Sequence, residues 1–157
     1  MISLLKAIWD TAYSITFRLI LIISSFPARL GWDRPVRGFM RLNARVVLLM
    51  RRGKSLTGLK EIGDEWRRMF PSEKFQEFIR VDKGTYYART HVRCPLRGTG
   101  DVRACHLLME FDRTLVDAFG GQFIVLTSQA QPGETTCTIA IRKKCAPVDD
   151  LVPAYRK

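Results

Sequence analysis

Apolar residues at helical spacing dominate the first thirty positions of the chain. From Leu4 to Ile23 they recur every three or four residues, the period of one face of an α-helix. Arg18 is the single charged residue between Asp10 and Arg29. The pattern therefore predicts a long apolar N-terminal helix. Its stripe consists of Leu4, Leu5, Ile8, Trp9, Ala12, Ile15, Leu19, Ile22 and Ile23.

The remaining pattern predicts two more helices and then a mixed domain. Helical spacing continues over Val36–Met50 and over Leu56–Phe70. Two β-prone runs then flank Asp82-Lys83-Gly84, which is typical of a hairpin. We expect strands over Phe75–Val81, Thr85–Arg93, Phe123–Ser128 and Thr135–Lys143, and one helix over about Val102–Phe119 that ends at Gly120-Gly121.

This order predicts an α+β fold, in which N-terminal helices precede a ββαββ domain with a mainly antiparallel sheet. The length of 157 residues suits one domain with an appendage. We expect a membrane-contacting helical segment over residues 1–54, an α+β domain over residues 55–145 and an extended tail over residues 146–157. The tail contains Pro147 and Pro153 and is expected either to dock on a partner or to be loose.

Charge is distributed unevenly along the chain. The net charge is +11, which points to an anionic partner: a nucleic acid, a membrane surface or an acidic protein. Residues 1–70 hold 13 basic and 5 acidic side chains, a net charge of +8, whereas residues 71–157 hold 13 and 10, a net charge of +3. The basic signal therefore belongs mainly to the N-terminal half.

Four interpretations of the apolar N-terminal segment remain open. A membrane-spanning helix needs about 20 apolar residues, and Arg18 near its centre would be costly. A signal peptide would place Lys6 before the apolar run, but no A-x-A-like cleavage site follows Ser24-Ser25. An interfacial helix lying in the headgroup plane fits the stripe, and so does a core helix of a soluble fold. We favour membrane contact over the core helix.

A basic stretch follows the apolar segment. Residues 27–60 contain nine arginines and lysines against the single acid Asp33. Such clusters attract anionic lipid and hold the adjoining domain on the cytoplasmic face. Within the stretch, four arginines share about one quadrant of a helical wheel and form either a phosphate-binding stripe or a solvated face. They are Arg37, Arg41, Arg45 and Arg52.

Candidate chemistry lies in the second half of the chain. On the helix predicted there, Cys105, Met109 and Asp112 follow at i, i+4 and i+7 and form one stripe. Cys94 ends one predicted strand, and Cys137 lies on another. We expect Cys94, Cys105, Asp112 and Cys137 to meet in one pocket. Glu110 and Asp117 are expected to face solvent.

Three interpretations of these cysteines compete. A metal site is disfavoured because the spacing Cys94-x10-Cys105-His106-x30-Cys137 matches no standard zinc pattern. A thiolate nucleophile at Cys94 would need a nearby base or cation, and His91, Arg93 and Arg97 are close in sequence. Small buried apolar cysteines are the third interpretation. We expect reduced thiols, because a chain of this length does not need disulfides for stability, and no cofactor, because no GxGxxG, P-loop, HExxH or G-x-S-x-G motif occurs.

Three short motifs in residues 56–143 resemble the L-2-amino-thiazoline-4-carboxylic acid hydrolase family. They are His-Val-Arg-Cys-Pro-Leu from His91, Met-Glu-Phe-Asp from Met109, and Pro-Gly-Glu-Thr-Thr-Cys-Thr-Ile ending in Ile139. The resemblance implies hydrolytic opening of a thiazoline ring, with Cys94, Asp112 and Cys137 at the family's motif positions. Met109 stands where the family pattern has a cysteine three residues before the aspartate. If that cysteine is required, the chain is a catalytically silent relative.

These observations support three functional hypotheses. The first is an accessory or interaction subunit of a membrane complex, at the cytoplasmic face, built on a hydrolase-like domain. The second is a cysteine-dependent hydrolase with a small-molecule substrate. In it Cys94 is the nucleophile, Asp112 handles protons, and Cys137 is a pocket wall or auxiliary thiol. A basic nucleic-acid-binding module comes third, because the sequence has no zinc-finger, RRM or KH signature.

Overall fold

The computed structural model describes residues 2–156, excluding the side chains of residues 2–10 and of Glu73. The predicted stripe residues Leu4, Leu5, Ile8 and Trp9 therefore lie outside the described side chains. The helices are α1 (Ile2–Arg29), α2 (Asp33–Arg51), α3 (Leu59–Arg68), α4 (Val102–Leu108) and α5 (Glu110–Phe119), with short 3₁₀ turns η1 (Glu73–Phe75) and η2 (Ala154–Arg156). The strands are β1 (Gln76–Asp82), β2 (Thr85–Thr90), β3 (Gly121–Thr127) and β4 (Cys137–Lys143).

The strands form one antiparallel sheet in the order β1-β2-β4-β3. With helices preceding and interrupting them, this confirms the α+β fold. The second strand ends at Thr90, three residues before its predicted end, because Thr90 makes the last pairing with both neighbours, Gln76 on β1 and Cys137 on β4. The chain then leaves the sheet in the loop that carries Cys94.

The helix predicted over Val102–Phe119 is divided at Met109. The ψ angle of Met109 is 2°, far from the helical value, and this residue is both the end of α4 and the start of α5. Asp101 caps α4 by accepting a hydrogen bond from the Ala104 N–H at 2.8 Å. Gly120, at φ 96°, ends α5 in the left-handed conformation that favours glycine, as predicted.

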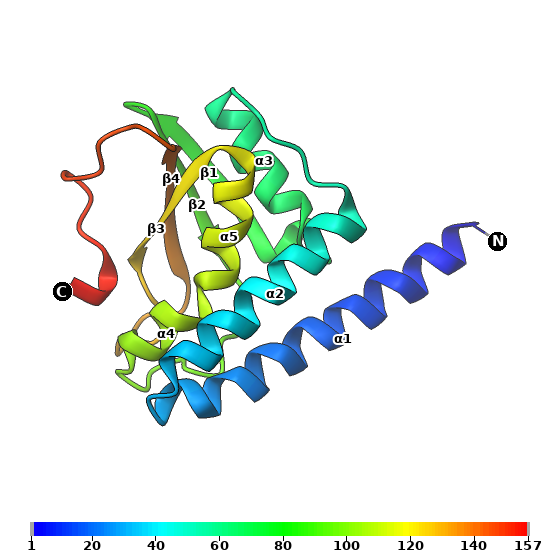
Figure 1. The fold of residues 1–157 in the computed structure, drawn as a ribbon, viewed down its shortest axis with the longest axis horizontal. Coiled ribbons are helices and arrows are strands. Elements are labelled where there is room, and N and C mark those ends of the chain that lie inside the picture. Colours follow the sequence, from blue (N-terminus) through cyan, green and yellow to red (C-terminus); the bar gives the residue numbers. More distant parts are fainter. Residues whose placement is uncertain (1, 157) are drawn as a thin grey trace.

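Helices α3 and α5 cover one side of the sheet, and α4 lies beyond the start of α5, against α1 and α2 (Figure 1). Aromatic rings fill the space between these layers: Trp66 lies 5.5 Å from both Phe70 and Phe123, measured between ring centroids. Helix α3 approaches the sheet so closely that a Cβ on Gly63 would lie 2.5 Å from the ring of Tyr86. No larger residue fits at this position.

Helices α1 and α2 form an N-terminal hairpin that packs on the domain from outside (Figure 1). The hairpin turns at Gly31, which adopts φ +85°. Arg103 of α4 fastens the turn by donating to the Ala28 carbonyl at 2.8 Å and pairing with Asp33 at 2.6 Å. Further along α1, the Tyr13 hydroxyl donates to the Met69 carbonyl at 2.8 Å.

The C-terminal segment docks on its own domain rather than remaining loose. Gln122 of β3 donates to the Ala146 carbonyl at 2.8 Å, and Arg142 of β4 pairs with Asp150 at 2.6 Å. The segment ends against α4, where the ring centroids of Tyr155 and His106 lie 4.2 Å apart. Its apolar and ionic contacts fix it along the side of β3.

Candidate functional site

A small cavity beneath the hairpin brings together the four predicted pocket residues Cys94, Cys105, Asp112 and Cys137. The prediction that they share one pocket is therefore confirmed as geometry. We call this space the thiol cavity. Its volume is about 40 Å³, enough for a few water molecules at roughly 10–15 Å³ each. Its remaining wall is mostly apolar and includes Phe17 and Leu21 of α1, Met40 of α2, and Phe70, Leu108 and Phe111 of the domain.

Gln129 joins the two loops that border the thiol cavity. Its side-chain amide donates to the Val92 carbonyl at 2.8 Å, and its Oε1 accepts from the Cys94 N–H at 3.3 Å. Its backbone N–H donates to the Cys137 sulfur at 3.3 Å. One buried glutamine thus holds the loop after β2 against the start of β4. This arrangement fixes two of the three thiols.

Asp112 is the acidic group of the thiol cavity. Its Oδ1 accepts a hydrogen bond from the indole N–H of Trp66 at 2.9 Å, and the residue is 8% exposed. Burial raises the pKa of Asp112 to about 6, although the Trp66 hydrogen bond and the charge of Arg113 lower it. A carboxyl group with a pKa near neutrality, held inside a cavity, is suited to giving and taking protons.

The pKa values of the three cavity thiols are raised, whereas an activated nucleophilic cysteine has a lowered pKa. Burial raises the pKa of all three, to about 12 for Cys105 and about 11 for Cys137, and the Cys94 pKa is raised as well. Two of the three predicted activators have other partners: His91 pairs with Glu77 at 2.9 Å, and Arg97 donates to the Thr135 carbonyl. The thiols are therefore protonated at neutral pH, and all four cysteines of the chain are free.

The sequence interpretation missed the polar residues that complete the cavity. Trp66 lies within the helical run Leu56–Phe70, and Gln129 falls between the predicted strands Phe123–Ser128 and Thr135–Lys143. Gln76 and Thr90 also line the cavity and share a 2.6 Å hydrogen bond. Amides and hydroxyls carry no spacing signal, so only the packed structure reveals that they converge here.

The prediction that Glu110 faces solvent is wrong. It is 7% exposed and lies within 2.6 Å of Arg41, 2.9 Å of Arg113 and 3.7 Å of Arg37. Helix α5 packs against α2, so residue 110 lies at the junction of the two helices. Asp117, by contrast, is exposed as predicted and pairs with Lys144 at 2.6 Å.

The predicted arginine stripe is divided by this ion pair. Arg37 and Arg41 contact Glu110 and help to join the hairpin to the domain. Arg45 and Arg52 are exposed, and the structure gives neither an ion pair with a described residue. Arg45 and Arg52 can therefore bind an external phosphate directly, whereas Arg37 and Arg41 would first have to break their ion pairs with Glu110.

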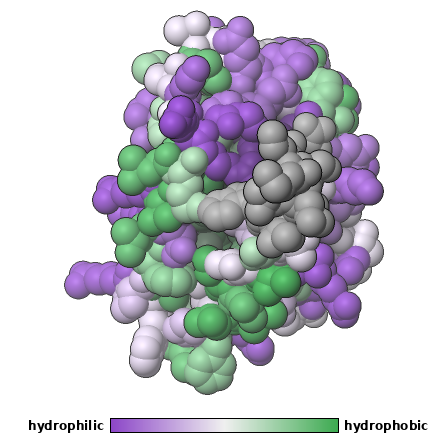
Figure 2. All heavy atoms as spheres, turned by 90° about the vertical axis from the view of Figure 1, so that its right-hand side faces the viewer, coloured by the Kyte–Doolittle hydropathy of each residue, from purple (hydrophilic) through white to green (hydrophobic). Residues whose placement is uncertain are grey.

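The outer side of the hairpin is strongly apolar. Within α1, the 19-residue stretch Thr11–Arg29 has a mean hydropathy of 1.3 and is long and apolar enough, by length and composition alone, to cross a membrane. Figure 2 shows hydrophobic residues gathered over the lower part of this side and hydrophilic residues over the upper part. We call the following set the hairpin face: Ile15, Leu19, Ile22, Ile23, Phe26, Leu30, Trp32, Phe39, Leu42, Val46, Leu49 and Met50, each at least 43% exposed.

The described residues contain no cluster of three or more His, Cys, Asp or Glu side chains placed to hold a metal ion. The resemblance to the thiazoline hydrolases rests on the three short motifs alone. In the comparisons with known proteins, no family model, curated protein or solved structure matches this chain.

Proposed function

We propose that this chain is a peripheral membrane protein whose hairpin face binds an anionic bilayer at the cytoplasmic surface. The observation that carries the proposal is the hairpin face itself. Soluble monomers rarely expose a contiguous apolar patch of this kind unless it contacts a partner or a membrane. Each of its side chains gains on the order of 1 kcal/mol on burial, so insertion of a few is enough for stable attachment.

The charges around the hairpin face match an anionic lipid surface. Residues 11–52 contain eight arginines and one acid, Asp33, which pairs with Arg103. Arg34 and Arg45 lie on one side of α2, 11 residues apart and beside the apolar stripe, and Arg52 follows directly at the end of the helix. Each such arginine contributes about 1 kcal/mol near an anionic surface. Apolar insertion and charge attraction thus act on the same side of the molecule.

The packing of α1 favours an interfacial helix over a spanning one. Its inner side is buried on the domain at Phe17 and Ala28, while the opposite side carries Ile15, Leu19 and Phe26. A spanning orientation would remove the inner side from the domain and open the thiol cavity to lipid. An interfacial helix keeps both sides covered.

The membrane, rather than a protein complex, is the proposed occupant of the hairpin face. One reason for expecting an accessory subunit was a C-terminal tail available for a partner, and that tail docks on its own domain. The role as an accessory subunit stays a prediction, and the vesicle test described below includes an outcome that would support it.

The test is flotation of the full chain with phosphatidylcholine vesicles that contain or lack phosphatidylserine. We expect binding to the anionic vesicles and at least tenfold weaker partitioning of a Leu19→Asn/Ile23→Asn variant. The change Arg45→Gln/Arg52→Gln should weaken binding about fivefold or more on anionic vesicles and have little effect on neutral ones.

The matched control is Val81→Asn, which places the same amide on an exposed apolar position of β1, at 45% exposure. It should bind vesicles as the wild type does. Equal loss in the control, or no flotation of the wild type, would refute the membrane proposal. So would discrete oligomers that persist with vesicles present and dissociate in the Leu19→Asn/Ile23→Asn variant, since the face would then join protein chains.

We propose a thiol-dependent hydrolase as a second candidate, supported by the position of Asp112 among three thiols in one cavity. In this reaction the Cys94 sulfur bonds to the carbon of a C=N group, and the thiol proton passes through the Asp112 carboxylate to the nitrogen. A water oxygen then bonds to the carbon as the C–N bond breaks, and the first water proton passes through Asp112 to the departing nitrogen, which leaves as an amine. The C–S bond breaks last, so the carbon keeps the oxygen as C=O and the remaining water proton restores the Cys94 thiol.

The hydrolase candidate is tested by a thiazoline ring-opening assay on vesicle-bound wild type and on a Cys94→Ala variant. The control is Cys145→Ala, which removes an exposed cysteine outside the cavity. Turnover that is lost in Cys94→Ala and kept in Cys145→Ala supports the candidate. Background rates in all three proteins refute it and leave the membrane proposal untouched.

A further inference from the structure

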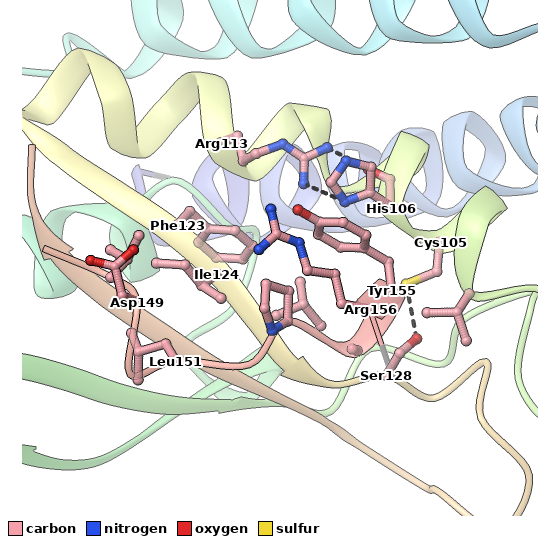
Figure 3. A pocket seen from close by; sticks show the side chains of 15 residues that line it. Cys105, His106, Arg113, Phe123, Ile124, Ser128, Asp149, Leu151, Tyr155 and Arg156 are labelled. Atoms are coloured by element: carbon pink, nitrogen blue, oxygen red, sulfur yellow. Dashed lines mark hydrogen bonds between the residues drawn. The ribbon is translucent and has the colours of Figure 1, made fainter.

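A second, larger cavity lies between the docked C-terminal segment, α4 and β3 (Figure 3). Its volume is about 330 Å³, at the lower end of the range of small-molecule sites. Neither the hairpin face nor the thiol motifs account for it. We call it the tail cavity, because residues 148–156 form one of its walls.

Apolar side chains line the body of the tail cavity. Phe123 of β3 and Val102 of α4 face Leu151 and Pro153 of the C-terminal segment. The ring of Tyr155 packs on His106 and adds an aromatic surface at the end where the segment meets α4. These walls suit a flat apolar body.

Two guanidinium groups converge at the same end. Figure 3 shows the Arg156 side chain reaching into the cavity toward Arg113, with the Tyr155 hydroxyl group near both. Arg113 is held from behind by Glu110 at 2.9 Å and by the Nδ1 of His106 at 3.4 Å. Arg156 is exposed, and the structure gives it no ion pair with a described residue.

Of the two guanidinium groups at this end, only Arg156 lacks a carboxylate partner among the described residues. Arg113 pairs with Glu110, which also contacts Arg41 and Arg37, and His106 is neutral because burial and the charges of Arg113 and Arg37 lower its pKa to about 4, against the raising effect of Glu110. Because Arg113 donates to Nδ1, the proton of the neutral ring lies on Nε2 and can be donated to a ligand. At the other end of the cavity, Asp149 disfavours a second negative charge (Figure 3).

We propose that the tail cavity binds a small organic anion that carries one carboxylate on a flat, apolar body. The carboxylate would pair with Arg156, whose planar guanidinium presents two parallel donors. The body would lie between Phe123, Tyr155 and Pro153. One carboxylate matches the one guanidinium without a carboxylate partner, and Asp149 at the other end of the cavity disfavours the second negative charge of a phosphate dianion.

Benzoate is the simplest probe of this proposal, and the two histidines provide the readout. In NMR spectra of the full chain at pH 7, benzoate should shift the ring signals of His106 and leave those of His91 in place. His91 lies outside the cavity beside Glu77, so it is an internal control. We expect a Kd near or below about 1 mM, and little effect from neutral benzamide or from inorganic phosphate.

Arg156→Gln should weaken benzoate binding about fivefold or more, because it removes the guanidinium that has no carboxylate partner. The matched control is Arg80→Gln, which makes the same change at an exposed position of β1, outside the cavity, and should bind benzoate as the wild type does. Three results would overturn the proposal: unmoved His106 signals, equal shifts with benzamide or phosphate, and unchanged affinity in Arg156→Gln. All of them are independent of vesicle binding.

Discussion

The N-terminal hairpin and the sheet domain use the same kinds of apolar residues in opposite ways. Of the fifteen large hydrophobic residues exposed among the described side chains, twelve form the hairpin face. The other three of the described side chains, Val81, Val152 and Tyr155, belong to the domain and its C-terminal segment, whose remaining large hydrophobic residues are buried or partly buried. Leu49 of α2 is 80% exposed, whereas Leu115 of α5 is fully buried. Burial thus depends on whether a partner layer exists within the chain.

The comparison also shows how the two regions are joined. The inner side of the hairpin covers the thiol cavity with Phe17 and Leu21, while none of the residues that the structure describes forms a layer over its outer side. Fixed polar contacts hold the two regions together: Glu110 with Arg41, Arg103 with Asp33, and Tyr13 with Met69. A helix with one docked and one uncovered apolar side fits a boundary between protein and lipid.

The largest expected effect tests burial itself. Leu115→Ala removes packing at a fully buried position and should lower the free energy of unfolding by about 3 kcal/mol. Leu49→Ala makes the same change on the hairpin face and should cost no more than about 0.5 kcal/mol. Urea unfolding of both variants without lipid measures the contrast. Equal losses would mean that the hairpin face is covered in solution.

The next effect concerns the acid in the thiol cavity. Asp112→Asn should raise the free energy of unfolding at pH 7 by about 2–3 kcal/mol, since the folded-state pKa of about 6 exceeds the unfolded value of 3.8. Below pH 3.8 the Asp112 carboxyl is protonated in both the folded and the unfolded chain, and the folded protein loses this proton as the pH rises through 6. The unfolding free energies of wild type and variant should therefore converge near pH 4. Urea unfolding at both pH values checks this. A variant less stable than wild type at pH 7 would show that the carboxylate is not strained.

Glu110→Gln should weaken the joint between hairpin and domain by about 2 kcal/mol at pH 7. Burial alone would raise the pKa of Glu110, but the Arg41 and Arg113 hydrogen bonds and charges outweigh it and lower the pKa. The stabilisation is therefore present above the unfolded pKa of 4.5 and is lost as the pH falls below it. Thermal unfolding at pH 7 and pH 3 should show a gap only at pH 7. A gap of the same size at both would point to packing instead of charge.

The smallest changes in stability are expected where α1 packs against the domain. Tyr13→Phe removes the hydrogen bond to the Met69 carbonyl and should cost about 1 kcal/mol. Ser24→Ala should have the opposite sign and similar size, because the buried Ser24 hydroxyl has no hydrogen-bond partner among the described residues. Amide hydrogen exchange of α1 without vesicles measures both. Changes of the same sign would show that α1 does not dock as described.

The apolar and polar pattern of the sequence was enough to predict the α+β order of elements, because each element carries its own period. The hairpin at Asp82-Lys83-Gly84 and the end of α5 at Gly120 followed from local turn chemistry. The grouping of Cys105, Met109 and Asp112 followed from helical spacing, which the bend at Met109 did not disturb. Turn chemistry and helical spacing depend on residues only a few positions apart, so these features can be predicted from the local sequence alone.

Only the tertiary structure decided which surfaces meet. It buried Glu110 against two arginines from a helix some seventy residues earlier, and it turned His91 away from Cys94 toward Glu77. It also placed Gln129 between the Cys94 loop and the start of β4. It closed the tail cavity with the C-terminal segment, for which the sequence allowed either docking on a partner or a loose tail. Such contacts depend on how layers stack, which no local period encodes. The sequence therefore determined the elements and their apolar sides, and the packing determined which of those sides were left without a partner.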